Sequence, residues 1–308
     1  MEEAAVPALD GPVLVTGATG RQGGAVVRHL QRAGIPVRAL CRNPSSEGAR
    51  RLGAAGIPVV GGDLDRPASL GPALDGAAGV FSVQNYWQPG IGYAGEVRRG
   101  RTLAEAAHRA GVQLFVQSTM ADADEDLAPL PAHFLSKRRI EAVVDDLGLP
   151  RTFLGTVFFM DNLGDKAMGG PLLFPMLTGA LEPGTQLQML SVTDIGRAAA
   201  TVFGSPGHFT GTRLDLVGDV LTVAQMRSVY RRATGRRPQG WAMPTAVSRR
   251  LSPEFVEQLE WQVAAGFTAR PDDTRRHVPA VLDLEQHLRS RGRTEELDRT
   301  RDDADVAA

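Results

Sequence analysis

The sequence predicts an α/β protein, a doubly wound parallel sheet with helices on both faces and a smaller C-terminal α/β lobe. Between residues 12 and 157, apolar strand-like segments alternate with amphipathic helical segments, and the connections between them are short. A glycine-rich turn, residues 17–23, joins the first strand to the first helix. The length of 308 residues accommodates one large domain of this kind with an appended lobe.

The predicted elements alternate regularly through the first half of the chain. Strands are expected at 12–15, 37–40, 57–60, 79–83, 113–117 and 152–157, and helices at 23–33, 47–55, 69–74, 94–110 and 133–147. Such a series can form the two mononucleotide-binding halves of a Rossmann-type sheet.

Beyond residue 158 the pattern changes. Residues 165–184 are rich in Gly, Pro, Met and Leu without a regular period, as expected of a lid over a small hydrophobic substrate. Helix 192–203, strand 213–217 and helix 223–233 follow. The predicted organisation is a tail at 1–10, a dinucleotide-binding domain at 11–160, a lobe at 161–290 interwoven with the last sheet strands, and a flexible tail at 291–308.

Composition narrows the class of protein. Apolar residues make up 43% of the chain, and 34 basic residues balance 35 acidic ones, so no nucleic-acid footprint is predicted. The sequence has no signal-peptide pattern and no apolar run long enough for a membrane span, which predicts a cytoplasmic protein without membrane contact. The single cysteine, Cys41, ends a strand and is expected to be buried. Scattered histidines predict no metal site.

The glycine-rich turn predicts a dinucleotide site. Gly17 allows the tight turn, Gly20 lets the backbone approach a pyrophosphate, and Gly23 lets the helix pack closely on the strand. The phosphates would bind at the helix N-terminus beside Thr19, Arg21 and Gln22. The alternative is a glycine-rich connection without a ligand, but the strand before the turn and the helix after it favour the cofactor site.

The second strand ends in Arg42 and Asn43 where NAD-binding proteins carry an acidic residue, so NADP(H) is the predicted cofactor. The alternative for Arg42 is a surface ion pair with Glu47. Asp63, followed by Leu64, comes directly after the third strand, where its carboxylate can accept from the adenine amine; a turn or N-cap aspartate is the alternative.

With these motifs, residues 11 to about 240 resemble the NmrA-like branch of the atypical short-chain dehydrogenases/reductases. The resemblance rests on the glycine loop, on Asn85-Tyr-Trp87 followed by Glu96-Val-Arg98, on His133-Phe-Leu-Ser-Lys137, and on Phe159-Met-Asp-Asn-Leu163. It implies further cofactor contacts from Gln84, Asn85, Tyr86, Arg98, Lys137, Phe159 and Asn162. The alternative for residues 85–87 is an aromatic anchor under the lid.

The catalytic motif departs from the superfamily pattern. Ordinary members use Tyr-x-x-x-Lys, in which the tyrosine exchanges a proton with the substrate oxygen. Here His133 stands one helical turn before Lys137, where the tyrosine would be. As a proton donor, this imidazole is expected to lose activity as the pH rises through about 6–7.5; the alternative is a histidine that only packs. Ser118 ends the fifth strand, where the superfamily places a hydroxyl that orients the substrate, which makes it a candidate for this role; an ordinary strand-end serine is the alternative.

Two functions from different classes follow from these residues. The first is an NADPH-dependent reductase of a small carbonyl, quinone or conjugated acceptor. The second, implied by similarity to NmrA-like redox sensors, is a non-catalytic NADPH sensor that regulates a protein partner. The missing tyrosine favours the sensor, whereas the apolar lid segment favours the reductase.

Overall fold

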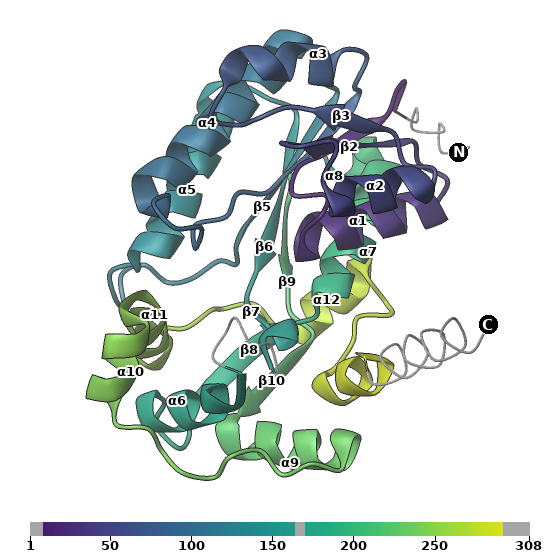
Figure 1. Ribbon diagram of the computed structural model, residues 1–308. Coiled ribbons are helices and arrows are strands. Elements are labelled where there is room, and N and C mark those ends of the chain that lie inside the picture. The colour runs from purple at the N-terminus through teal and green to yellow at the C-terminus, as the bar shows by residue number, and fades with distance from the viewer. Residues whose placement is uncertain (1–8, 164–169, 292–308) are drawn as a thin grey trace, which may run out of the picture.

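The computed structural model describes residues 9–163 and 170–291. Its main sheet has seven parallel strands in the order β3-β2-β1-β4-β5-β6-β9 (Figure 1). Their bounds are β1 Val13–Val15, β2 Val37–Cys41, β3 Val59–Gly61, β4 Gly79–Ser82, β5 Leu114–Met120, β6 Arg151–Thr156 and β9 Arg213–Leu216. The reversal of strand order at β1 and β4 is that of a Rossmann-type sheet, which confirms the predicted fold class.

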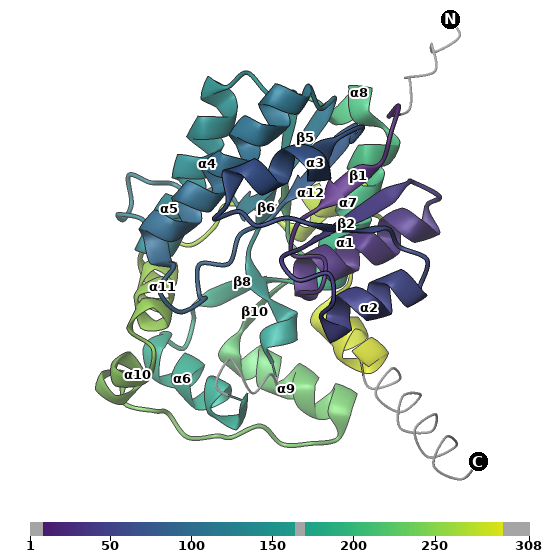
Figure 2. The ribbon, with the colours of Figure 1, turned by 45° about the horizontal axis from the view of Figure 1, so that its top comes forward.

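Helices cover both faces of this sheet (Figures 1 and 2). One face carries α1 (Arg21–Arg32), α2 (Glu47–Ala54) and α7 (Val192–Gly204), and the other carries α3 (Leu70–Leu74), α4 (Gly92–Ala110) and α5 (Ala132–Asp146). Side chains alternate along each strand, so Val13 and Val15 pack with α1 and α7, whereas Leu14 packs with α3, α4 and α5. The strand periodicity therefore accounts for two separate apolar layers.

The second half of the chain returns to the main sheet. The predicted strand at 213–217 is β9, which pairs with β6 in parallel, and α7 packs against α1. Side-chain caps begin both helices: the hydroxyl of Ser191 caps α7, and Thr222 forms a capping box with Gln225 at the start of α9 (Val223–Thr234). The first and second halves of the chain thus share one core.

A smaller sheet and its helices lie beyond the main sheet (Figure 2). Its strands, in the order β10-β8-β7, are β7 Phe158–Phe159, β8 Gln186–Leu190 and β10 Asp219–Thr222. The surrounding helices are α6 Leu173–Ala180, α9, α10 Thr245–Leu251 and α11 Pro253–Ala264. α12 Pro271–His277 packs against β9 of the main sheet, α8 Pro206–Phe209 precedes β9, and a last helical segment begins at 284. Short 3-10 turns occur at η1 Pro67–Ser69, η2 Met160–Asn162 and η4 Gly170–Leu172.

Some sequence predictions were incomplete in this region. Helices α10 to α12 were not predicted, although a proline at the first position of α11 and of α12 was an available signal. Within the predicted lid, residues 170–184 form η4, α6 and the turn into β8, whereas residues 165–169 lie outside the described residues. The two predicted tails lie almost entirely outside them as well. Cys41 is buried, as predicted.

Among the described residues, no helix combines the length and the apolar character needed to cross a lipid bilayer.

Candidate functional site

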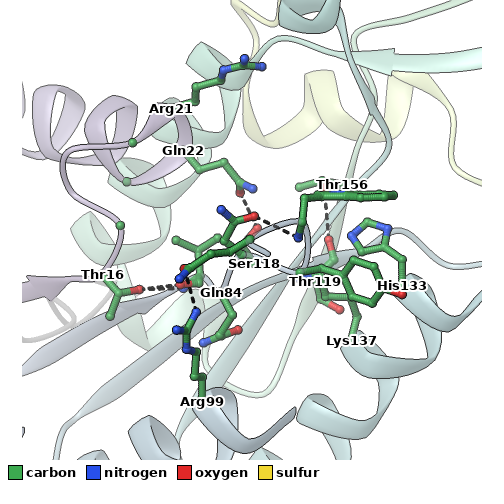
Figure 3. Close-up of a pocket in the computed structure, with 18 of the residues that line it drawn as sticks. Thr16, Arg21, Gln22, Gln84, Arg99, Ser118, Thr119, His133, Lys137 and Thr156 are labelled. Carbon is green, nitrogen blue, oxygen red and sulfur yellow. Dashed lines mark hydrogen bonds between the residues drawn. The ribbon is translucent and has the colours of Figure 1, made fainter. Parts of the chain in front are cut away.

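A cavity of about 910 Å³ lies at the carboxyl edge of the main sheet, where it meets the C-terminal lobe (Figure 3). Because the strands are parallel, the residues that follow β1 to β6 converge on this edge. Of the sequence-predicted site residues, all but Arg98 line the cavity: Gly17, Thr19, Gly20, Arg21, Gln22, Gly23, Arg42, Asn43, Asp63, Leu64, Gln84, Asn85, Tyr86, Ser118, His133, Lys137, Phe159 and Asn162. Segments far apart in the chain therefore form one site.

The glycine loop has the geometry that its sequence predicted. Gly17 has a φ of +59°, the left-handed region that favours glycine, and the amide of Gly20 donates to its carbonyl at 2.8 Å. A Cβ on Gly23 would lie 2.3 Å from the Gly17 oxygen and 2.4 Å from that of Thr16. Helix α1 begins at Arg21 without a side-chain cap, so its first amide N–H groups can donate to an anion in the cavity.

Gly23→Ala is expected to lower the free energy of unfolding by about 1–3 kcal/mol, because the new methyl group meets rigid backbone on two sides. Gly53→Ala is the matched control. Gly53 lies in exposed α2 with no neighbour within 4 Å, so alanine there should be neutral or stabilising. Urea unfolding measures both changes, and equal effects in the two variants would contradict the close approach of α1 to β1.

The end of β2 forms the second part of the site. Arg42 is exposed and lines the cavity beside Asn43. Its alternative partner, Glu47, instead pairs with Arg51 at 2.5 Å. Arg21, the other predicted arginine, donates from Nη1 to Asn162 Oδ1 at 3.3 Å, which links the glycine loop to the η2 turn.

Asp63 forms a turn contact and also lies in the cavity wall after β3. Its Oδ1 accepts from the Asp65 amide at 3.0 Å, as in a turn aspartate, and the residue also lines the cavity. The two readings therefore do not exclude each other.

The predicted contact by Arg98 is the exception among the site residues. Arg98 is exposed on α4, where it pairs with Asp65 at 3.1 Å, and it does not line the cavity. The next residue, Arg99, does so with a side chain that is only 8% exposed. One position along a helix rotates a side chain by about 100°, and the sequence motif did not fix which of the two arginines faces inward.

Polar side chains at the ends of β1, β4 and β5 are bonded to one another. The Val83 amide donates to Thr16 Oγ1 at 2.8 Å, and Gln84 Nε2 donates to Ser82 Oγ at 2.8 Å. Ser118 Oγ donates to Gln22 Oε1 at 2.7 Å (Figure 3). In this arrangement the Ser118 hydroxyl is left with acceptor capacity toward the cavity.

Lys137 is held by a buried carboxylate. Its Nζ lies 2.5 Å from Oε1 of Glu96, whose side chain is fully buried in α4, and Ser136 Oγ donates to the second oxygen of Glu96 at 2.5 Å. The ammonium group is thereby fixed in the cavity wall, with N–H donors remaining for a ligand.

His133 lies one turn before Lys137 on α5, as predicted, but its proton chemistry differs from the prediction. Its ring packs against Tyr86 and Trp87 with centroids 5.0 Å away in each case. Burial, with a smaller contribution from the Lys137 charge, lowers the pKa of His133 to about 3. The expected loss of a proton near pH 6–7.5 was therefore wrong, because the sequence argument assumed an exposed ring. Its buried Nδ1 has no hydrogen-bond partner among the described residues.

The part of the cavity around His133 is aromatic, and sequence reasoning missed most of its phenylalanines. Phe255 and Gln258 from α11, Phe267 from the segment that follows it, and Phe158 from β7 also line the cavity, and Phe134 stacks between His133 and Phe267. An isolated bridge between Ala123 and Phe267 fixes that segment against the end of β5. Nothing local in the sequence distinguishes these phenylalanines from core residues.

Comparison with known proteins identifies the family. The model of the NmrA-like family matches residues 10–274 of this chain. The chain belongs to the NmrA-like family. An NAD(P)H azoreductase of Xenophilus azovorans is 31% identical over 228 residues, which cover 73% of this chain and 74% of that protein.

A further relative and a solved structure are also similar to this chain. The nitrogen metabolite repression protein nmr of Neurospora crassa is 26% identical, covering 91% of this chain and 64% of its own length. The crystal structure of Citrobacter sp. triphenylmethane reductase complexed with NADP(H) has a TM-score of 0.74 at 20% identity, covering 91% of this chain and 99% of that one. The last likeness establishes a shared fold.

Proposed function

We propose that this protein binds NADPH in the cavity and reduces a small conjugated acceptor, a quinone or a carbonyl compound. The observation that carries the proposal is the continuity of the cavity. The glycine loop and Arg42 line one part of it, and Lys137, His133 and the phenylalanines of the C-terminal lobe line another. The relatives include an NAD(P)H azoreductase and a triphenylmethane reductase complexed with NADP(H), which are enzymes of this reaction class.

The residues present fit a dinucleotide. The space that a Cβ on Gly23 would fill is taken by the loop backbone, and the uncapped amides of α1 suit a pyrophosphate. Arg42 and Asn43 would hold the 2′-phosphate, Asp63 the adenine, and Lys137 the hydroxyl groups of the second ribose. When bound, the reduced cofactor supplies a hydride, and the protein supplies orientation and a dry environment.

The acceptor would bind against the aromatic wall. Neutral His133 can donate one N–H to an acceptor oxygen or nitrogen, while its second ring nitrogen remains unprotonated. Burial has the opposite effect on the neighbouring phenol: it raises the pKa of Tyr86, which therefore keeps its proton at neutral pH. The proton that completes the reduction then comes from solvent rather than from a histidinium ion.

Turnover of a defined panel tests the proposal. Purified protein is mixed with NADPH and with quinones, azo compounds, enones and aldehydes, and NADPH oxidation is followed by its absorbance. Oxidation that requires both the protein and one acceptor class supports the reductase. NADPH binding without oxidation by any acceptor overturns it.

NADPH is expected to bind at least tenfold more tightly than NADH, because charge-assisted bonds from arginine to the 2′-phosphate contribute about 1.5–3 kcal/mol each. Arg42→Ala should remove this preference and leave the affinity for NADH unchanged. Arg50→Ala, which changes an exposed arginine of α2 outside the cavity, is the control. Calorimetry of both cofactors with the three proteins measures the effect; a preference that survives Arg42→Ala would reject this residue as its source.

The second candidate function is a redox sensor. It is favoured by the replacement of the superfamily tyrosine with a histidine that cannot act as an acid at neutral pH, and by similarity to the Neurospora nmr protein. If the protein is a sensor, none of the acceptors should cause it to oxidise NADPH. NADPH binding should instead protect residues 170–184 from proteolysis. Protease digestion with and without NADPH, read by mass spectrometry, separates this outcome from turnover.

A further inference from the structure

A buried arginine connects two loops at the edge of the cavity. Arg99, in the second turn of α4, donates from Nε and Nη2 to Asp65 Oδ2 at 3.0 and 2.6 Å. Its Nη1 donates to Gln88 Oε1 at 3.0 Å. The side chain is 8% exposed and also lines the cavity (Figure 3).

The two loops belong to different parts of the site. Asp65 follows Asp63 and Leu64 in the turn after β3, the part assigned above to the adenine. Gln88 follows Tyr86 and Trp87, the rings that pack against His133. Arg99 thus reaches from the cofactor side of the cavity to its aromatic side.

The loop at residues 85–90 has few other attachments. Its internal hydrogen bonds are local, from the Trp87 and Gln88 amides to Asn85. The Gln88 carbonyl accepts from the Ile91 amide, just before α4, at 3.0 Å. Within the described residues, the bond from Arg99 to Gln88 is the one hydrogen bond that joins this loop to a residue more than three positions away in the chain. The Tyr86 and Trp87 rings also pack against His133.

We propose that Arg99 is a positioning residue that couples dinucleotide binding at the turn after β3 to the placement of the Tyr86–Trp87 loop at the acceptor end. The inference rests on the proposed function in that it takes NADPH to be the ligand. Ordering of the 63–65 turn by the adenine would fix Asp65, and Asp65 would fix the guanidinium that holds Gln88. Only arginine can serve both partners, because its planar group presents five donors in fixed directions, of which three are used here.

The charges of Arg99 and Asp65 stabilise their ion pair at neutral pH. The guanidinium of Arg99, with a smaller contribution from Arg98, lowers the pKa of Asp65 to about 2, so the carboxylate stays charged at neutral pH. Because Arg99 is shielded from water, this pair is screened by salt less than a surface pair.

Trp87 provides a readout of loop position that does not depend on catalysis. The chain has three tryptophans. Trp87 is 42% exposed, Trp241 is 48% exposed and Trp261 is buried. In a Trp241→Phe background, quenching of fluorescence by acrylamide therefore reports mainly on Trp87, and calorimetry reports NADPH affinity separately.

In the parent background, NADPH is expected to reduce the quenching of Trp87. Arg99→Met should abolish this response and weaken NADPH binding about 10-fold or more, as for loss of a charge-assisted network. Gln88→Ala cuts only the link to the loop, so it should abolish the response while weakening binding by about 10-fold at most. Arg99→Lys should keep one of the two hydrogen-bond partners. It should therefore retain more of the NADPH affinity than of the Trp87 response. Arg101→Met, an exposed arginine of the same helix, should change neither quantity.

The outcomes separate the two proposals. A parent that does not bind NADPH contradicts the proposed function. A parent that binds NADPH, with a Trp87 response that persists in Gln88→Ala, overturns the coupling through Arg99. Gln88→Ala removes no charge and no buried group, so the test remains decisive even when Arg99→Met does not fold.

Discussion

His133→Leu is expected to reduce turnover by about 10²–10³-fold, the cost of removing one preorganised hydrogen-bond donor from a substrate atom that gains charge in the transition state. NADPH affinity should change little, because the ring packs against Tyr86 and Trp87 and not against the glycine loop. His108→Leu, at an exposed position of α4, is the control. Steady-state rates and calorimetry measure the two effects; turnover that survives His133→Leu would leave solvent as the source of both the hydrogen bond and the proton.

The pH dependence of the parent protein distinguishes a neutral imidazole from a histidinium ion. With its pKa lowered to about 3, His133 is neutral throughout the range from about pH 5 to pH 8, so no titration of this residue should appear in the turnover profile. A decline in turnover through about pH 6–7.5 that disappears in His133→Leu would instead show that His133 acts in its charged form.

Unlike turnover, the folding stability is expected to depend on the protonation of His133. Unfolded His133 takes up a proton below its ordinary pKa of about 6.5, whereas the folded residue does so only near pH 3. The contribution of neutral His133 to stability is therefore fully present above about pH 6.5 and is lost as the pH falls toward 3. His133→Leu should unfold with a weaker dependence on pH in this window.

The parts of the site that the sequence predicted well are those set by local backbone geometry. A turn that must adopt a positive φ at Gly17 and admit no Cβ at Gly23 leaves a visible pattern of glycines. The same holds for Arg42, whose position follows from the end of one strand. Register along a strand fixes which residue reaches the cavity, so these assignments needed no tertiary information.

The parts that were missed depend on contacts between distant segments. Phe255 and Phe267 reach the cavity because α11 and the segment after it fold back toward the end of β5, which no local period reveals. The choice of Arg99 over Arg98 depends on how α4 is rotated against the sheet. The low pKa of His133 arises from burial by residues far from it in the sequence.

Lys137→Met is expected to weaken NADPH binding by about 1–3 kcal/mol, roughly 10- to 100-fold, because ribose hydroxyl groups would lose a charged donor. The structure adds a second effect. Removal of the ammonium group leaves the fully buried Glu96 carboxylate without its cation. Breaking a buried pair in this way costs about 3–5 kcal/mol of folding stability. Urea unfolding should therefore show a large loss in the single variant.

The double variant Lys137→Met/Glu96→Gln separates binding from stability. A neutral amide at position 96 still accepts from Ser136 and no longer carries an unpaired charge, so most of the stability should return. The affinity for NADPH should not return, because the donor to the ribose is still absent. Arg139→Met, at an exposed position of α5, controls for loss of a surface cation near the site. Recovery of both stability and affinity in the double variant would mean that Lys137 serves only to neutralise Glu96 and does not contact the cofactor.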